Sequence, residues 1–219
     1  MRDAAALWGR RLLMLAVGTV VSQAGIQLFV AVRLGSDPYM VFIQGVARLT
    51  GLSNGMAMNI VMLVLMALLL AFTSGYIRPG TVLCTFCVGP LVGAYERLYG
   101  LLLPAEPALA LRCALILLAC VIASFGLAVM LQSEAGACPN DLISVVLSDK
   151  IGRLEFRFAR IGTDAVLVAA GFLMGGTVGV GTLASVCLYG PIIQVFTPTA
   201  KKLARLLHVE EIAARQEKL

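Results

Sequence analysis

Charged residues are scarce in this chain. Asp, Glu, Lys and Arg make up 13% of the 219 residues, whereas an average soluble domain contains about 25%. Uncharged polar residues do not replace them, because the mean hydropathy is +0.94. The composition therefore excludes an ordinary soluble domain and indicates a chain that is mostly surrounded by lipid.

The little charge that is present does not indicate a nucleic-acid-binding protein. The formal net charge is +5, but the basic residues lie between apolar runs and in the C-terminal tail, not along one face of a soluble domain. In a membrane protein such residues set the orientation of the chain. We expect the lipid bilayer, and no nucleic acid, as a partner.

Residue groups typical of catalytic and metal sites are also missing. His208 is the only histidine, and no cluster of Cys, Asp or Glu lies beside it to complete a metal site. Cys84 and Cys87 form a Cys-x-x-Cys pair, but they lie within an apolar run, where a reactive thiolate is unfavourable. We expect no cofactor, no metal, no structural disulfide and no enzymatic activity.

Long apolar runs take the place of the missing charge. A helix needs about 20 apolar residues to cross the hydrocarbon core, and six runs approach this length. They cover residues 12–32, 56–74, 80–100, 113–132, 161–174 (extending toward 178) and 180–196. The predicted fold class is all-α and transmembrane, with six spanning helices.

The distribution of Lys and Arg predicts the orientation of these spans, because cytoplasmic loops collect basic residues. With the N-terminus inside and six spans, thirteen Lys and Arg residues fall on the cytoplasmic side. The four on the outside are Arg33, Arg48, Arg97 and Arg112. Both termini are therefore predicted to be cytoplasmic.

The chain contains two related halves. A shift of 101 residues aligns them without a gap, and six of the ten glycines between 11 and 98 then fall on a glycine. Each half has three spans, an odd number, so the second half enters the membrane from the opposite side, as in many secondary transporters. We predict an inverted 3+3 repeat, with units at 1–103 and 104–198 and a cytoplasmic amphipathic tail at 199–219.

Each half also has a segment that is too short to span. Residues 38–50 and 139–151 each begin at a proline, which suits the first turn of a helix, and each is followed closely by a glycine, a common helix stop. Thirteen helical residues are only about 20 Å long. The segments are predicted to be re-entrant helices, whose N-termini could face an anionic group, or helices lying flat at the interface.

A central site between the halves has eight candidate lining or hinge residues. They are Pro38, Gly89, Pro90, Pro139, Asp141, Asp164, Gly190 and Pro191. Ionisable residues inside a membrane usually face protein or water, so Asp164 is a candidate proton- or cation-linked carboxylate; the alternative is an i,i+4 ion pair with Arg160. The Gly-Pro pairs predict either kinked, closely packed helices or broken helices whose freed carbonyls line the site.

Several of these elements resemble a known group of proteins. They are Gly35-x-x-Pro38, Gly80-Thr81, Gly89-Pro90, the helix of Asp164 and the glycine-rich run 175–182. Together they are similar to the YczE/YyaS/YitT group of bacterial membrane proteins, over about residues 10–198, and most of all to its YczE-like branch. The resemblance implies a protein of the bacterial inner membrane but supplies no substrate.

The leading functional hypothesis is a small secondary transporter or exporter of an unknown small molecule or ion, with its site between the inverted repeats. A non-transporting scaffold for a partner assembly is one alternative. A passive channel is another, supported only by the glutamines Gln23 and Gln27 on one face of the first span. A homodimer is compatible with the sequence.

Overall fold

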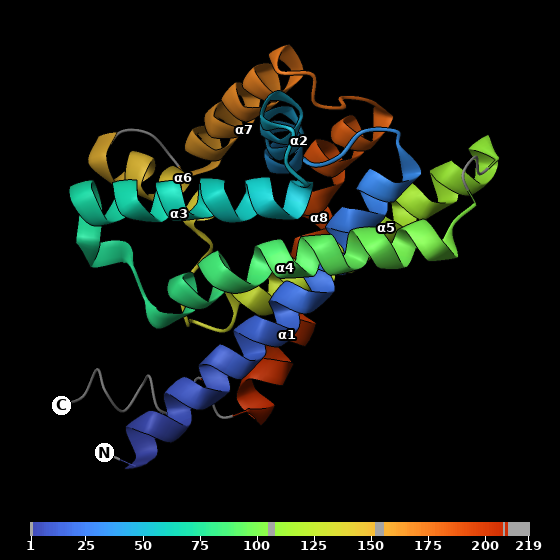
Figure 1. Cartoon of the computed structure of the whole chain (residues 1–219). Helices are drawn as coiled ribbons and strands as arrows, with labels where there is room; N and C mark the ends of the chain where they lie inside the picture. Colours follow the sequence, from blue (N-terminus) through green and yellow to red (C-terminus); the bar gives the residue numbers. More distant parts are fainter. Residues whose placement is uncertain (1, 105–107, 152–155, 208, 210–219) are drawn as a thin grey trace.

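The structure, a computed structural model, describes residues 2–104, 108–151, 156–207 and 209, and every regular element in this part of the chain is helical (Figure 1). The elements are α1 (Arg2–Val32), α2 (Pro38–Thr50), α3 (Asn54–Thr73), the short 3₁₀ helix η1 (Ser74–Tyr76), α4 (Pro79–Leu102), α5 (Leu109–Leu131), α6 (Pro139–Ile151), α7 (Phe156–Leu173) and α8 (Val180–Leu206). The predicted all-α class is confirmed.

Four of the described helices are long and apolar enough to cross a membrane. They are Ala6–Val32 within α1, α3, α5 and α8, and they coincide with four of the six predicted spans. Helices also form at the third and fifth predicted spans, as α4 and α7, but they are not as apolar as the other four. The number of six spans therefore stays a prediction.

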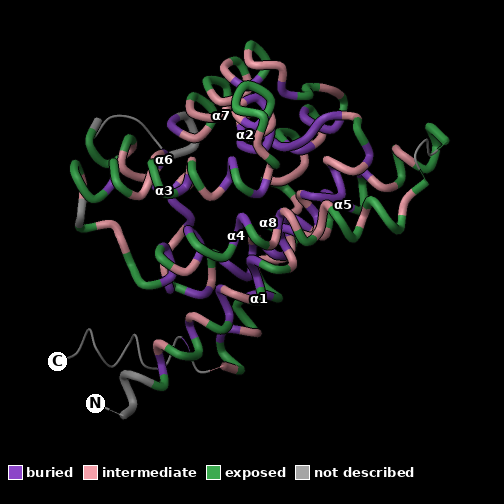
Figure 2. The backbone as a smooth tube through the Cα atoms, in the orientation of Figure 1, coloured by how far each residue is buried: buried purple, intermediate pink, exposed green. Residues whose placement is uncertain are grey.

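The outward faces of the helices are apolar. Figure 2 shows the buried residues concentrated along α1 and the start of α2, with exposed residues on the outside of the other helices. Large side chains such as Phe72, Leu173 and Val195 are 74%, 85% and 72% exposed. A soluble protein rarely exposes apolar surface on this scale, so these faces are suited to lipid.

The sequence explains where α2 begins and ends. Pro38 occupies the first turn, where a helix needs no backbone donor. The carboxylate of Asp37 caps the helix by accepting hydrogen bonds from the N–H groups of Tyr39 and Met40, each at 3.1 Å. The helix ends at Gly51, which has the left-handed φ of 70° that glycine adopts readily. The predicted bounds of both short helices, 38–50 and 139–151, are confirmed.

Helices α1 and α5 pack closely and antiparallel at the centre. A Cβ atom on Gly25 would lie 2.4 Å from the backbone nitrogen of Ala123, and one on Gly126 would lie 2.3 Å from that of Ser22. Gly25 and Ser22 correspond to Gly126 and Ala123 under the 101-residue shift. The two helices therefore touch through equivalent positions of the two halves.

The same equivalence holds where the halves meet beyond this crossing. The N–H of Gly80 donates to the carbonyl of Ala135 at 3.0 Å, and the N–H of Gly181 donates to that of Leu34 at 2.8 Å. Gly80 corresponds to Gly181, and Leu34 to Ala135. Each half thus binds the start of a long helix from the other half with the same backbone hydrogen bond.

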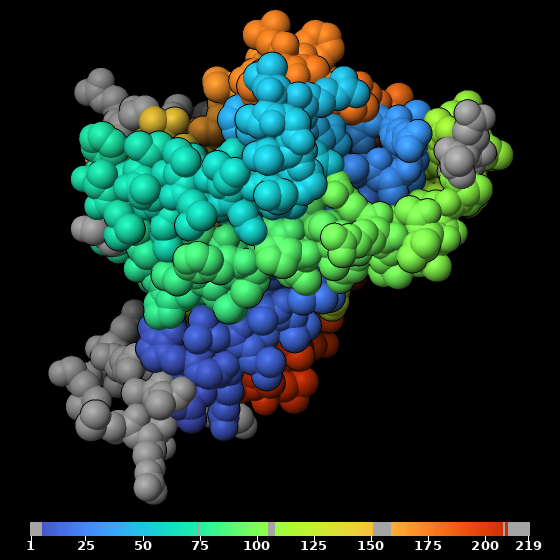
Figure 3. All heavy atoms as spheres, in the orientation of Figure 1, coloured from blue at the N-terminus to red at the C-terminus, as the bar shows by residue number. Residues whose placement is uncertain are grey.

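Other contacts differ between the halves. Helix α3 packs along α4, where a Cβ on Gly55 would lie 2.7 Å from the carbonyl oxygen of Gly89 (Figure 3). In the described part of the chain, the counterpart helices α7 and α8 do not pack along each other. Helix α7 packs on α2 instead, and a Cβ on Gly171 would lie 2.6 Å from the backbone of Val41 and Phe42. The two halves therefore adopt different arrangements.

The Gly-Pro pairs do not break their helices. Helix α4 continues through Pro90 and α8 continues through Pro191, so the interpretation as broken helices with freed carbonyls is wrong for this structure. Gly89 instead provides close packing against α3, whereas the Cβ position of Gly190 has no described atom within 4 Å. Helix α8 also extends to Leu206, across the predicted start of the tail at 199; residues 208 and 210–219 of that tail lie outside the described residues.

Glycine replacements should separate close packing from open helix surface. Gly25→Ala is expected to lower the free energy of unfolding by about 1–3 kcal/mol, because the new methyl group meets backbone atoms that cannot move aside. Gly190→Ala is the matched control: it meets no atom and should leave stability unchanged or raise it by up to about 1 kcal/mol. Thermal unfolding in detergent measures both, and equal effects would contradict the packing at the α1–α5 crossing.

Candidate functional site

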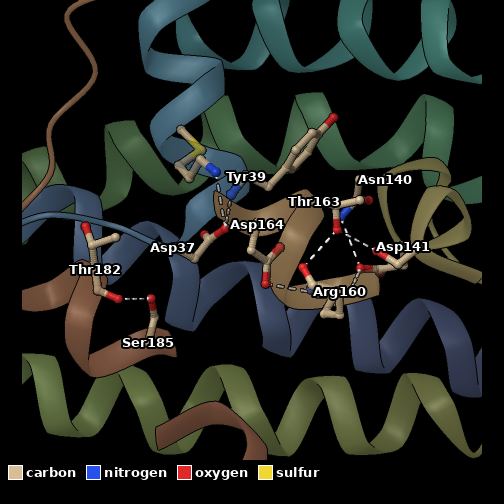
Figure 4. A network of polar contacts seen from close by, with 11 residues as sticks. Asp37, Tyr39, Asn140, Asp141, Arg160, Thr163, Asp164, Thr182 and Ser185 are labelled. Atoms are coloured by element: carbon tan, nitrogen blue, oxygen red, sulfur yellow. Dashed lines mark hydrogen bonds and ion pairs between the residues drawn. The ribbon is translucent and has the colours of Figure 1, made fainter. Parts of the chain in front are cut away.

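The N-terminal ends of α2 and α6 approach each other inside the protein. In Figure 4, Asp37 and Tyr39 of the first half lie near Asp164 of α7, and Asn140 and Asp141 of the second half lie near Arg160 of the same helix. Residues 35–41 are all buried. Both short helices therefore begin in the interior, because Pro139 at the start of α6 is buried as well.

One guanidinium group ties α6 to α7. Arg160 Nη1 lies 2.6 Å from Asp141 Oδ1, and Arg160 Nε lies 3.3 Å from Asp164 Oδ2. Asn140 Nδ2 also donates to Asp141 Oδ1, at 3.2 Å. The predicted i,i+4 pair between Arg160 and Asp164 is thus confirmed, and it belongs to a larger group that includes a carboxylate from another helix.

Two hydroxyl groups reinforce this contact one turn further along α6. Ser144 Oγ and Thr163 Oγ1 are 2.8 Å apart, and Thr163 Oγ1 donates to the carbonyl of Arg160 at 2.9 Å. Ser144 is almost fully buried. The hydrogen bonds fix the face that α6 presents to α7, and they hold Asp141 within reach of Arg160.

Asp37 adds a third carboxylate to the group. Figure 4 places it beside Asp164, and its side chain is only 8% exposed. Its Oδ1 caps α2, but its Oδ2 is buried with no hydrogen-bond partner among the described residues. A buried carboxylate oxygen without a donor is strongly unfavourable, so this oxygen is a place for a proton or for a donor on a ligand.

Further polar atoms near this point are unsatisfied. In the described part of the chain, Ser36 Oγ, Tyr39 OH and Asn140 Oδ1 are buried without a hydrogen-bond partner. Tyr39 and Asn140 occupy equivalent positions in the two halves. Native proteins leave few buried polar atoms unpaired unless water or a ligand meets them, so the junction between α2 and α6 has the chemistry of a binding site.

The charges of the site are unequal. Asp37, Asp141 and Asp164 face a single cation, Arg160. No set of three or more His, Cys, Asp or Glu residues within the described residues is arranged to hold a metal ion. Carboxylates thus outnumber cations among the described residues of the site.

The structure brings together half of the predicted site residues. Pro38, Pro139, Asp141 and Asp164 lie at the junction of α2, α6 and α7. Gly89 is buried against Asn59 and Gly55 of α3. The other three, Pro90, Gly190 and Pro191, are exposed on the outer faces of their helices and line no part of this site.

Two members of the site, Asp37 and Arg160, are not among the eight predicted site residues. Asp37 was recognisable as a helix cap, but its counterpart in the second half is Cys138, so the repeat gave no sign of a carboxylate there. Arg160 was recognisable as a neighbour of Asp164, but its bond to Asp141 joins residues 19 positions apart. Only the packing of α6 on α7 reveals that contact.

The two ends of the molecule differ in a way that bears on access to the site. At one end, here called the Glu134 end, Arg11 Nη2 lies 2.7 Å from Glu134 Oε2, and Arg78 Nη1 donates to the Glu134 carbonyl at 3.1 Å. At the other end, called the Arg48 end, a cavity of about 670 Å³ is lined by Arg33 and Arg48. An ion pair thus joins α1 to the segment after α5 at one end, and a cavity lies at the other.

Comparison with known proteins identifies relatives that match most of the chain. The model of a family described as a family of unknown function, DUF6198, matches residues 9–198. "Uncharacterized protein YyaS" of Bacillus subtilis is 24% identical over 194 residues, which cover 85% of this chain and 92% of the relative. The "Uncharacterized membrane protein YczE" of the same organism is 24% identical over 198 residues, which cover 90% of each.

A third relative, an "Uncharacterized protein" of Haemophilus influenzae, is 28% identical over 184 residues, covering 83% of this chain and 79% of the relative. No solved structure is significantly similar to the chain. The resemblance to the YczE and YyaS proteins that the sequence motifs predict is confirmed. The chain is a membrane protein, as its apolar helices and the name of one relative agree.

Proposed function

The chain belongs to the DUF6198 family, and we propose that it is a small secondary transporter of the bacterial plasma membrane. In this proposal α4 and α7 span the membrane together with α1, α3, α5 and α8. Both termini are cytoplasmic, because that orientation puts twelve of the sixteen Lys and Arg residues other than Arg160 inside. The protein carries a proton or small solute and catalyses no covalent reaction.

The packing of α1 against α5 supports an inverted repeat. The two helices are antiparallel and touch through equivalent residues of the two halves, Gly25 with Ala123 and Gly126 with Ser22. A two-fold axis that exchanges antiparallel helices is perpendicular to them. If the helices span the bilayer, the axis lies in the membrane plane, which is the geometry of inverted-topology transporters.

Helices α2 and α6 are then re-entrant. Their N-terminal ends meet near mid-depth, and their C-terminal ends point to opposite sides. The end of α2 lies near the turn after α7, where Thr177 N–H donates to Gln44 Oε1 at 3.0 Å. The end of α6 lies near η1, where Tyr76 OH donates to Asp149 Oδ2 at 2.8 Å. Non-spanning helices at membrane depth are stable when protein encloses them, as it does the start of α2.

The observation that carries the proposal is the half-buried group of Arg160, Asp141 and Asp164, beside the buried Asp37, in a largely apolar chain. Ionisable groups at membrane depth are costly, and they typically mark the paths of protons, ions or substrates. A scaffold would have no need for a buried carboxylate oxygen without a partner, such as Asp37 Oδ2.

The different packing of the two halves supports alternating access. Here α3 packs on α4, α7 packs on α2, and an ion pair lies at the Glu134 end. In an inverted repeat, exchanging these arrangements between the halves gives a second conformation that faces the other way. The cavity of the described conformation lies at the Arg48 end, which is the outside in the proposed orientation.

Proton flux in liposomes tests the proposal. The full chain is reconstituted with a trapped pH-sensitive dye, and phosphate, citrate, amino acids and small amines are added outside in turn. The proposal expects proton movement that saturates with one class of solute and is missing from protein-free liposomes. Flux that rises without saturation would identify a channel. No flux with any solute, together with a co-purifying protein, would favour the scaffold.

A further inference from the structure

The cavity at the Arg48 end lies outside the central carboxylate site and has a chemistry of its own. Its volume is about 670 Å³, within the usual range for small-molecule sites. Its polar lining includes Arg33, Gln44, Arg48, Asn54, Glu96 and Thr177. These residues come from the ends of α2 and α4, the start of α3 and the segments after α1 and α7.

A second hollow adjoins the cavity at the same end of the protein. Its volume is about 390 Å³, and it shares Val30, Arg33 and Glu96 with the first. Gln27 also lines it, and Gln27 Nε2 lies 3.7 Å from Met40 Sδ, in the first turn of α2. The second hollow thus reaches a residue that contacts the first turn of α2.

The two arginines give the cavity an excess of positive charge, because Glu96 is the one carboxylate among the described residues that line it. In the described part of the chain, no carboxylate forms an ion pair with Arg33 or Arg48. Glu96 accepts a hydrogen bond from the side-chain amide of Asn54. The Oε1 of Gln44 is taken by Thr177 N–H, so its amide N–H groups remain to donate. Donors therefore outnumber acceptors in the lining.

The backbone at Arg33 indicates that its position is specified. Its φ is 60°, a left-handed conformation that is unfavourable by roughly 1–2 kcal/mol for a residue with a side chain. The equivalent residue in the second half is Glu134, which has the same kind of conformation with φ 53°. Both halves thus hold a charged residue in a strained conformation directly after a long helix.

The charges of Arg33 and Glu134 have different surroundings. The carboxylate of Glu134 is neutralised by Arg11 at 2.7 Å. At the equivalent place in the first half the charge is reversed, and Arg33 faces a cavity. An anion that enters this cavity would neutralise the charge of Arg33 and Arg48, as Arg11 neutralises the charge of Glu134.

We propose that the cavity at the Arg48 end binds an oxyanion, a carboxylate or phosphate group, through Arg33 and Arg48. Arginine suits this role because its planar fork donates two hydrogen bonds to such groups. The proposal of oxyanion binding depends only on the cavity and its residues. The further idea that this binding is the first step of uptake rests on the proposed transport function. The same chemistry is offered by a free solute and by the headgroup of an anionic lipid.

A binding experiment on the full chain distinguishes the two sources. The protein is placed in nanodiscs of phosphatidylcholine and titrated with inorganic phosphate and with citrate, while chloride keeps the ionic strength constant. A free-solute site gives a rise in unfolding temperature that saturates. A headgroup site gives no rise there, but nanodiscs that contain phosphatidylglycerol stabilise the protein.

Arginine variants decide whether the effect belongs to this cavity. Arg48→Gln and Arg33→Gln should each weaken the apparent affinity about tenfold, or abolish the lipid effect, as loss of one charged hydrogen-bonding partner predicts. Arg97→Gln is the control: it removes the same charge from an exposed position outside the cavity, and the affinity should stay within about twofold. If neither the stabilisation by free oxyanions nor the stabilisation by phosphatidylglycerol depends on Arg33 or Arg48, the proposal is overturned. Oxyanion binding without any flux would leave this site intact and overturn the transporter.

Discussion

Arg160→Gln is expected to lower the free energy of unfolding by about 2 kcal/mol and to abolish transport. The change leaves Asp141 and Asp164 without the cation that they share. Losing one partner of a fully buried ion pair is unfavourable by about 3–5 kcal/mol, and the smaller value applies because these side chains are 23–40% exposed. Chemical unfolding in detergent measures the stability, and dye-loaded liposomes measure the flux.

A second substitution separates the two effects. Adding Asp141→Asn to Arg160→Gln removes one of the uncompensated carboxylates, so much of the lost stability should return. Transport should not return, because the central charge pattern is still altered. A single variant as stable as the native protein would show that the ion group is not formed. Recovery of flux in the double variant would exclude a transport role for Arg160.

Asp164→Asn is expected to reduce proton-coupled flux by roughly 100-fold, as for the loss of a group that transfers protons. The amide has nearly the same shape but cannot gain or lose a proton. The closer pair, between Arg160 and Asp141, remains, so the protein should stay folded. Solute binding should therefore survive the substitution while its coupling to protons is lost.

Asp149→Asn is the matched control for this prediction. Asp149 is also a carboxylate of the second half, but it is exposed at the far end of α6, where it accepts from Tyr76. Its replacement should leave proton-coupled flux within about twofold of the native value, as for other exposed polar contacts. Normal coupling in Asp164→Asn would remove the role assigned to Asp164, and equal losses in both variants would point to a general effect of charge.

Much of the fold is predictable from local signals. The bounds of α2 and α6 follow from Pro38, Pro139 and the glycines that follow, because proline and glycine restrict where a helix can begin and end. Aligned glycines in the two halves also predict where backbones meet, as at Gly25 and Gly126. The sequence can reveal these contacts because only glycine, which has no side chain, allows two backbones to approach so closely.

The site was less predictable, because its members are joined by packing and not by sequence spacing. The symmetric Gly-Pro pairs predicted equivalent roles, yet Gly89 is buried against α3 while Gly190 is exposed. Equivalent residues of the two halves can therefore have different neighbours and different burial in a single conformation of the chain. Similarly, the bond between Arg160 and Asp141 depends on how α6 folds back on α7, which no local pattern specifies.

The most direct test of the account concerns the far ends of the two short helices. Single cysteines are introduced as Thr50→Cys at the end of α2 and Lys150→Cys near the end of α6, both exposed positions, after the six native cysteines are replaced. A membrane-impermeant maleimide is applied to intact cells and to inside-out vesicles. Two inverted halves predict that Thr50→Cys reacts only from outside and Lys150→Cys only from the cytoplasmic side. Labelling of both from the same side would contradict the inverted repeat and the transport mechanism built on it.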